Sequence, residues 1–413
     1  MNEHINVLKP FVLTGNDPQS FAETVNWLQK HTKQQDFCTD DMKILSYSGV
    51  TNVNGKYEVS FLSIDPLYPY VQHDNILKFD KKKFVVNKEI FDMIYESGLV
   101  FLIGSQIFVV DQKAFASIGS FLDCHGRMLY NGWIGRDLCI ADALSDMEHI
   151  NFIYRENEQD NVKFVIAVLG EKQKYRRIDD SIEECLNSLP KPHEIKMYKW
   201  QVKNEAFYVW EDYPKYQLEI HGVQWYFGIM IFRPDFVRQL YHFSYYARFD
   251  DVYIVLGTDK LNYDKNLKEK RKILSKSFSQ NFNMFRSKLD MLLYSIDWRK
   301  QYKTSMFNGG DLVDRILDQV AIKKYIGVAR YQKMKVELLK QLMTKEVVLV
   351  YDVFIEILRA GSPYMCELND RYRELYMKKI LELPGVLKKE FVHEKKRENT
   401  FEGQISLFDC VNR

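Results

Sequence analysis

Paired carboxylates are the residues in this sequence whose types could do metal chemistry. Carboxylates bind Mg²⁺, so clustered acids are the first thing a metal-dependent nuclease would need. Neighbouring residues on a helix or strand point in different directions, however, so an adjacent pair does not make a two-ligand site by itself. Helix caps and surface positions explain such acids more simply, and we predict no metal site. The pairs are Asp179-Asp180, Glu183-Glu184, Glu211-Asp212 and Asp250-Asp251.

Other catalytic signatures are missing from the sequence. It contains neither the phosphate-binding G-x-x-x-x-G-K-(S/T) loop nor the nucleophile motif G-x-S-x-G. His149, His221 and His242 lack the spacing of metal ligands. The six cysteines are scattered without a C-x-x-C pair, which indicates reduced intracellular thiols. We therefore predict no cofactor, and the sequence leaves open whether the protein is an enzyme.

Basic residues gather in two segments that are candidates for binding DNA phosphates. The first lies at the end of a predicted strand, where loops often carry function, and it includes Tyr175. The second opens a long predicted helix, with aromatic residues interleaved. A solvated helix face is an equally good explanation of the second segment. The candidate DNA-binding residues are Lys172, Lys174, Arg176 and Arg177 in the first segment, and Lys268, Lys270, Arg271, Lys272 and Lys276 in the second.

The most specific motif lies close to the C-terminus, after a charged stretch without apolar periodicity. Gln404, Ile405, Ser406, Leu407 and Phe408 resemble the pentapeptide by which bacterial polymerases and repair proteins bind the β sliding clamp. The resemblance implies that Leu407 and Phe408 fill an apolar pocket of the clamp, and that Gln404 forms a hydrogen bond at a second subsite. Alternatively, the apolar residues of this peptide pack on the protein's own core as a terminal strand. The resemblance implies a partner and does not imply an enzyme.

Three stretches of the body resemble a family of unknown function that phages and plasmids carry, the phage/plasmid-like domain. They are Phe108–Leu122, Lys174–Asp179 and Tyr351–Leu358, which resemble a strand followed by a helix, a strand end and a late helix of that family. In place of the Cys-Thr-Asn-Gly segment of many members, this chain has Gly228 to Pro234, Gly-Ile-Met-Ile-Phe-Arg-Pro. The resemblance implies a mobile-element protein and supplies no catalytic residue.

The elements that must position these residues can be outlined from periodicity. Alternating apolar and polar residues over 195–232 predict several antiparallel strands lined by aromatic rings. An apolar stripe from Leu274 to Ile296 predicts one long helix, and further helices follow at 311–326, 330–344, 346–359 and 367–383. We expect Gly361-Ser362-Pro363 and Pro384-Gly385 to end helices. The earlier chain mixes strands and helices, including a helix over 18–30 with Asp17 as its N-cap.

Composition limits the possible classes of protein. A chain of 413 residues predicts at least two domains, and its net charge of +2 excludes a polycation that coats nucleic acid. The apolar runs are too short to span a membrane, and the N-terminus lacks a signal peptide, so we expect a cytoplasmic protein.

The predicted fold class is α+β: a mixed, partly antiparallel sheet domain, a helical domain and a flexible C-terminal tail. The expected boundaries are 1–255, 256–390 and 391–413. The function that fits is a non-enzymatic protein of DNA replication, recombination or repair, from a bacterium or mobile element. It would be recruited by the sliding clamp and would contact DNA through basic surfaces. The alternatives are a clamp-tethered metal-dependent nuclease and a clamp-occupying inhibitor that does not bind DNA.

Overall fold

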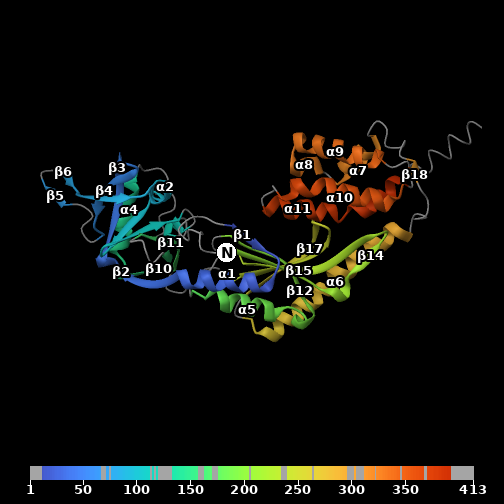
Figure 1. Ribbon diagram of the computed structural model, residues 1–413, viewed down its shortest axis with the longest axis horizontal. Helices are drawn as coiled ribbons and strands as arrows, with labels where there is room; N and C mark the ends of the chain where they lie inside the picture. Colours follow the sequence, from blue (N-terminus) through green and yellow to red (C-terminus); the bar gives the residue numbers. More distant parts are fainter. Residues whose placement is uncertain are drawn as a thin grey trace, which may run out of the picture.

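The described residues form two large sheets of different character, joined by helices (Figure 1). Two small two-stranded sheets accompany them, β5 (Val71–His73) with β6 (Ile76–Lys78) and β18 (Tyr302–Lys303) with β19 (Val347–Val348). A computed structural model of the protein confirms the predicted α+β class, with sheets in the N-terminal part and helices in the C-terminal part. The structure describes residues 12–66, 71–73, 76–111, 114–115, 118–119, 133–156, 162–169, 175–203, 206–233, 240–262, 265–294, 302–303, 311–320, 322–344, 347–366 and 370–391.

The antiparallel sheet has seven strands in the order β1-β12-β13-β15-β16-β17, with β14 paired to β15. The alternation predicted over 195–232 is confirmed, because every second side chain of β15 (Trp225, Phe227, Ile229, Ile231) is buried. The sheet extends further than the periodicity indicated, and residue 255 lies within its last strand. The strands are β1 (Val12–Gly15), β12 (Lys196–Lys203), β13 (Ala206–Asp212), β14 (Leu218–Ile220), β15 (Val223–Arg233), β16 (Leu240–Phe249) and β17 (Val252–Asn262).

The mixed sheet has eight strands in the order β2-β10-β11-β9-β8-β3-β4-β7. Its strands β9 and β11 pair in parallel, whereas the other neighbours are antiparallel. The turn Asn54-Gly55 has positive φ at both residues and joins β3 to β4. The strands are β2 (Thr32–Cys38), β3 (Met42–Val53), β4 (Lys56–Ile64), β7 (Asp80–Val86), β8 (Val100–Ile103), β9 (Gln106–Val110), β10 (His149–Glu156) and β11 (Val162–Leu169); α2 (Lys88–Ser97) and α4 (Trp133–Ser145) pack on it.

The mixed sheet is an insertion in the unit built on the antiparallel sheet. Strand β1 and helix α1 (Pro18–His31) precede all strands of the mixed sheet, and α5 (Ile178–Ser188) follows them. Strand β1 nevertheless pairs with β12, with Val12 opposite Lys203 and Gly15 opposite Trp200. The antiparallel unit is therefore discontinuous in sequence, a common arrangement for inserted domains.

Helices α1, α5 and α6 (Leu267–Tyr294) lie along one side of the antiparallel sheet (Figure 1). The predicted cap of α1 is confirmed, since the Asp17 carboxylate accepts a hydrogen bond from the Ser20 N–H at 2.8 Å. The predicted stripe of α6 is confirmed as well: Phe282 and Phe285 pack edge-on against Phe227, with ring centroids 4.7 and 6.0 Å apart. We call the face of the sheet that α6 covers the inner face, and the opposite one the outer face.

The C-terminal helices form a compact group beside β17 (Figure 1). The tip of the sheet contacts α10 through Trp225, whose indole N–H donates a hydrogen bond to the Tyr351 hydroxyl at 2.7 Å. The helices are α7 (Asp311–Gln319), α8 (Ile322–Ile326), α9 (Val328–Met343), α10 (Val350–Cys366) and α11 (Asp370–Ile380), followed by a further helical stretch over 383–391. Among the described residues, none of the helices is both long and apolar enough to cross a membrane.

Two details of the predicted helical part were wrong. Gly361-Ser362-Pro363 does not end a helix, because α10 continues through Pro363 to Cys366. Gly361 is instead a point of close approach: a Cβ atom there would meet the Tyr376 hydroxyl of α11, so the glycine makes room for that ring. Phe391, which the prediction assigned to the flexible tail, is instead helical and fully buried.

Candidate nucleic-acid interface

The packing of α5 against α6 brings the two predicted basic segments together. Glu184 of α5 contacts both segments. Its carboxylate accepts a hydrogen bond from the Lys270 ammonium and lies 3.7 Å from the Arg176 guanidinium. Arg271 makes a second contact between α6 and α5, because its Nε–H donates a hydrogen bond to the Asn187 carbonyl at 2.7 Å. Segments that lie more than 80 residues apart in sequence therefore share one surface.

Lys270 differs from the other predicted members of its segment because it is fully buried. Its ammonium binds Glu184 and lies 5.9 Å from the centre of the Tyr241 ring of β16. A lysine buried in this way holds α6 to α5 and to the sheet, and its charge is already matched by a carboxylate. The buried ammonium is thus a structural contact within the predicted segment.

Three lysines of α6 remain exposed and share one side of the helix. Lys268, Lys272 and Lys276 follow at intervals of four residues, which places them in a row on an α-helix. The helix that carries them begins at a cap, where the Asn266 side chain accepts a hydrogen bond from the Glu269 N–H at 2.9 Å. We call this row the α6 lysine row. It offers three cations in the geometry that a chain of phosphates can contact.

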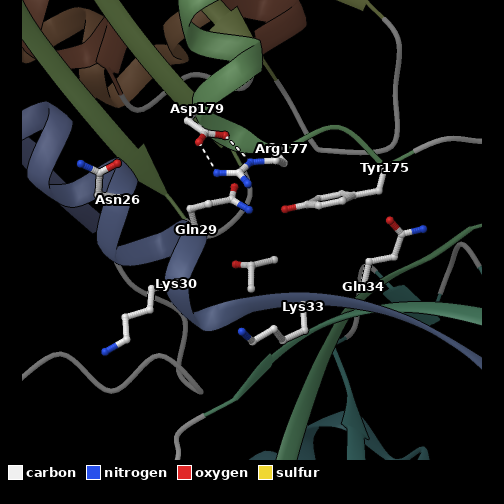
Figure 2. A pocket seen from close by; sticks show the side chains of 9 residues that line it. Asn26, Gln29, Lys30, Lys33, Gln34, Tyr175, Arg177 and Asp179 are labelled. Atoms are coloured by element: carbon white, nitrogen blue, oxygen red, sulfur yellow. Dashed lines mark hydrogen bonds and ion pairs between the residues drawn. The ribbon is translucent and has the colours of Figure 1, made fainter.

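A polar pocket of about 570 Å³ lies beside the first basic segment, between the end of α1, the start of β2 and the start of α5 (Figure 2). Figure 2 shows Tyr175 and Lys33 among the residues that line this pocket, and Arg177 bound to Asp179 beside them. The lining contains three cationic and three carboxamide side chains, which suits phosphate and sugar oxygens better than an apolar ligand. The lining residues are Asn26, Gln29, Lys30, Thr32, Lys33, Gln34, Tyr175, Arg177 and Asp179.

The electrostatics of this pocket depend on short contacts at the start of α5. Arg177 donates hydrogen bonds to both carboxylate oxygens of Asp179, at 3.1 and 2.6 Å, and this lowers the pKa of Asp179 and raises that of Arg177. Burial raises the pKa of Tyr175, so its hydroxyl stays protonated and can donate a hydrogen bond. The first N–H group of α5, on Ile178, is bound to the Gln29 side chain at 2.9 Å. Positive charge in the pocket therefore comes from side chains and not from the helix terminus.

The surface is not uniformly cationic, because α5 also exposes the carboxylates of Asp180 and Glu183. Exposed positive charge lies at the pocket and along the α6 lysine row, and it is accompanied by exposed negative charge on α5.

The adjacent carboxylates do not converge in a cleft. In the described part of the chain, no group of three or more histidine, cysteine or acidic side chains could hold a metal ion. Glu184 binds Lys270, Asp250 binds Arg359, and Asp251 accepts a hydrogen bond from Tyr198. Glu211 and Asp212 point to opposite faces of the antiparallel sheet, as the prediction for adjacent residues requires, and Asp212 binds Arg248 at 2.5 Å.

Several predicted residues lie outside the described residues: Lys172, Lys174 and the whole clamp-like peptide, Gln404 to Phe408. Sequence reasoning missed Lys30, Lys33 and the carboxamides of the pocket, because they belong to the amphipathic α1 and the edge strand β2, about 140 residues from Arg177. No local pattern marks them. The insertion of the mixed sheet separates α1 from α5 in sequence, and the packing of α1 against α5 brings these residues together. Compared with known proteins, the chain matches no family model, no curated protein and no solved structure.

Proposed function

We propose that this protein acts in DNA metabolism without itself being an enzyme, recruited by the sliding clamp and contacting DNA through basic surfaces. The observation that carries the DNA contact is the packing of α5 on α6, which joins the two basic segments in one surface. The recruitment rests on the pentapeptide Gln404 to Phe408, whose few anchors would bind weakly alone. Simultaneous contact of the body with DNA would strengthen the attachment by avidity.

Recruitment is tested by retention on immobilised bacterial sliding clamp. We expect the wild-type chain to be retained and the Leu407→Ala/Phe408→Ala variant to wash through, because the two apolar anchors supply most of the binding energy of such a peptide. Val411→Ala/Asn412→Ala is a matched control in the same tail and should behave like the wild type. Equal retention of all three proteins contradicts clamp recruitment.

DNA contact is tested separately, with labelled duplex DNA and no clamp. Lys268→Glu/Lys272→Glu should lower affinity about tenfold or more and reduce the dependence of log K on log salt by about 0.9 for each phosphate that the variant no longer neutralises. The control Lys333→Glu/Lys340→Glu changes the net charge equally, at exposed positions of α9. A wild-type protein that binds the clamp but not DNA would support the inhibitor alternative, and Mg²⁺-dependent cleavage of the DNA would support the nuclease.

A further inference from the structure

The outer face of the antiparallel sheet carries a row of aromatic rings that no described helix needs for its packing. Tyr208 and Phe232 are direct cross-strand partners on β13 and β15, and their rings stack with centroids 4.5 Å apart and planes inclined by 13°. Trp210 continues the row, 5.9 Å from Tyr208 and inclined by 17°. We call Tyr208, Trp210 and Phe232 the outer ring row. Its three ring planes are nearly parallel.

The rings of this row are partly exposed, unlike those of the inner face. Trp225, Phe227 and Phe243 of the inner face are at most 1% exposed and belong to the larger of the two hydrophobic cores. In contrast, the outer ring row and its neighbours Tyr226 and Met230 neither belong to nor pack against either core of the described residues. Large apolar side chains gathered on an accessible face are typical of a binding surface.

Exposed lysines border the outer ring row. Lys199 lies opposite Trp210 on the neighbouring strand β12, with its ammonium 5.9 Å from the centre of the indole ring. Lys203 is exposed two positions beyond Gln201 on the same strand, and Lys260 is exposed on β17 opposite His242. The outer-face carboxylate at the end of β13, Asp212, is buried and forms an ion pair with Arg248. It also accepts a hydrogen bond from the Tyr246 hydroxyl at 2.8 Å. The described residues therefore give the outer face a cationic border around aromatic rings.

The side chains beside the outer ring row are closely packed against one another. The Arg248 guanidinium lies between two rings, 3.6 Å from the centre of Tyr198 and 4.2 Å from that of Tyr226. Tyr246 lies flat across the sheet over Gly228, where a Cβ atom would collide with the tyrosine ring and with the Glu211 carbonyl. Side chains that are already held in place lose little conformational entropy when a ligand binds, so the ligand has less to offset.

We propose that the outer face binds single-stranded DNA, with bases stacking on Tyr208, Trp210 and Phe232 and phosphates contacting Lys199 and Lys203. Aromatic rings bordered by lysines are the combination that single-strand binding uses, since every unpaired base has a face to stack while its phosphate stays on the rim. Duplex DNA hides its base faces, and an apolar protein partner would not need the lysines. The four strand spacings from β12 to β17 amount to about 19 Å, enough for a site of a few nucleotides. This inference specifies the form of DNA within the proposed function, but it uses neither the clamp peptide nor the α6 lysine row.

The test is fluorescence anisotropy of a labelled 20-nucleotide oligothymidine, with the full-length chain and no clamp. We expect Trp210→Ala and Phe232→Ala each to weaken binding about tenfold and Trp210→Phe to restore most of it. Lys199→Glu/Lys203→Glu changes only exposed residues, so it tests the site even if the ring variants fold poorly. It should lower the salt slope by about 0.7 for each phosphate that is no longer neutralised, whereas Lys333→Glu/Lys340→Glu should leave the slope unchanged.

A second readout locates the strand directly. An oligonucleotide carrying 5-iododeoxyuridine should cross-link under ultraviolet light to residues 206–212 and 223–233. Wild-type affinity in Lys199→Glu/Lys203→Glu would overturn the proposal, as would cross-links confined to other segments. Tighter binding of the equivalent RNA would overturn the assignment to DNA, and a dimer abolished by Trp210→Ala would show that a second copy covers this face. Loss of duplex binding in the Lys268→Glu/Lys272→Glu variant with intact binding of oligothymidine would separate the two DNA surfaces.

Discussion

The two faces of the antiparallel sheet use the same residue types in opposite ways. On the inner face, Trp225 and Phe227 contact rings of α6 and are withdrawn from solvent. On the outer face, Trp210 and Phe232 lie in a partly exposed row beside lysines. A composition rich in phenylalanine, tyrosine and tryptophan is compatible with both uses. The difference shows that the covering helices, and not the strands themselves, decide which rings become core.

The largest expected effect compares two phenylalanines of one strand. Phe227→Ala should lower the free energy of unfolding by about 3–5 kcal/mol, because it leaves a cavity beneath α6. Phe232→Ala should cost about 1 kcal/mol or less, because its site opens to solvent. Denaturant unfolding of both variants measures the difference. Equal losses would show that the outer face is packed as tightly as the inner one.

The second comparison concerns two consecutive acids of β13, Glu211 on the inner face and Asp212 on the outer face. Burial, and then the neighbouring Asp212, raise the pKa of Glu211 from 4.5 to about 8. Between these values the folded protein keeps a proton that the unfolded chain has released. Stability should therefore fall as the pH rises through this window, by at most about 1.4 kcal/mol per pH unit from this group. Thermal unfolding from pH 5 to 9 should show this slope in the wild type and a smaller one in Glu211→Gln.

The exposed Glu219 of β14 supplies the control for this titration, since Glu219→Gln should keep the wild-type slope. If Glu211→Gln and Glu219→Gln follow the same pH profile as the wild type, the inner face does not hold a protonated glutamic acid at neutral pH.

The smallest expected effect compares buried and exposed lysines of α6. Lys270→Met leaves Glu184 without its buried partner but still near Arg176, so we expect a loss of about 1–3 kcal/mol in unfolding free energy. Lys272→Met, on the exposed side, should stay within about 0.5 kcal/mol of the wild type. Denaturant unfolding curves of the two variants measure this difference in unfolding free energy. A neutral Lys270→Met would mean that hydrophobic contacts alone hold α6 to α5.

Much of the fold could be predicted from local patterns. The cap at Asp17, the alternation of β15 and the stripe of α6 each depend on residues near one another in sequence. Gly361-Ser362-Pro363 misled the prediction because a glycine that makes room for another helix looks the same in sequence as one that ends a helix.

The candidate site was predictable only in part. The two basic segments were visible as runs of charge, but the burial of Lys270 depends on Glu184, a residue 86 positions away. The outer ring row was equally hidden, since its members alternate with core residues along β13 and β15. Nothing in the alternation itself shows which face of a sheet will be covered.

The direct junction between α1 and β2 connects the two large sheets. Helix α1 ends at His31 and strand β2 begins at Thr32, so no linker separates a helix packed on one sheet from a strand paired in the other. Thr32 is buried, and its hydroxyl donates a hydrogen bond to the Leu28 carbonyl at 2.8 Å, which stiffens the joint. Thr32 also lines the polar pocket. A molecule bound in that pocket would therefore contact a helix pair packed beside one sheet and the edge strand of the other at the same time.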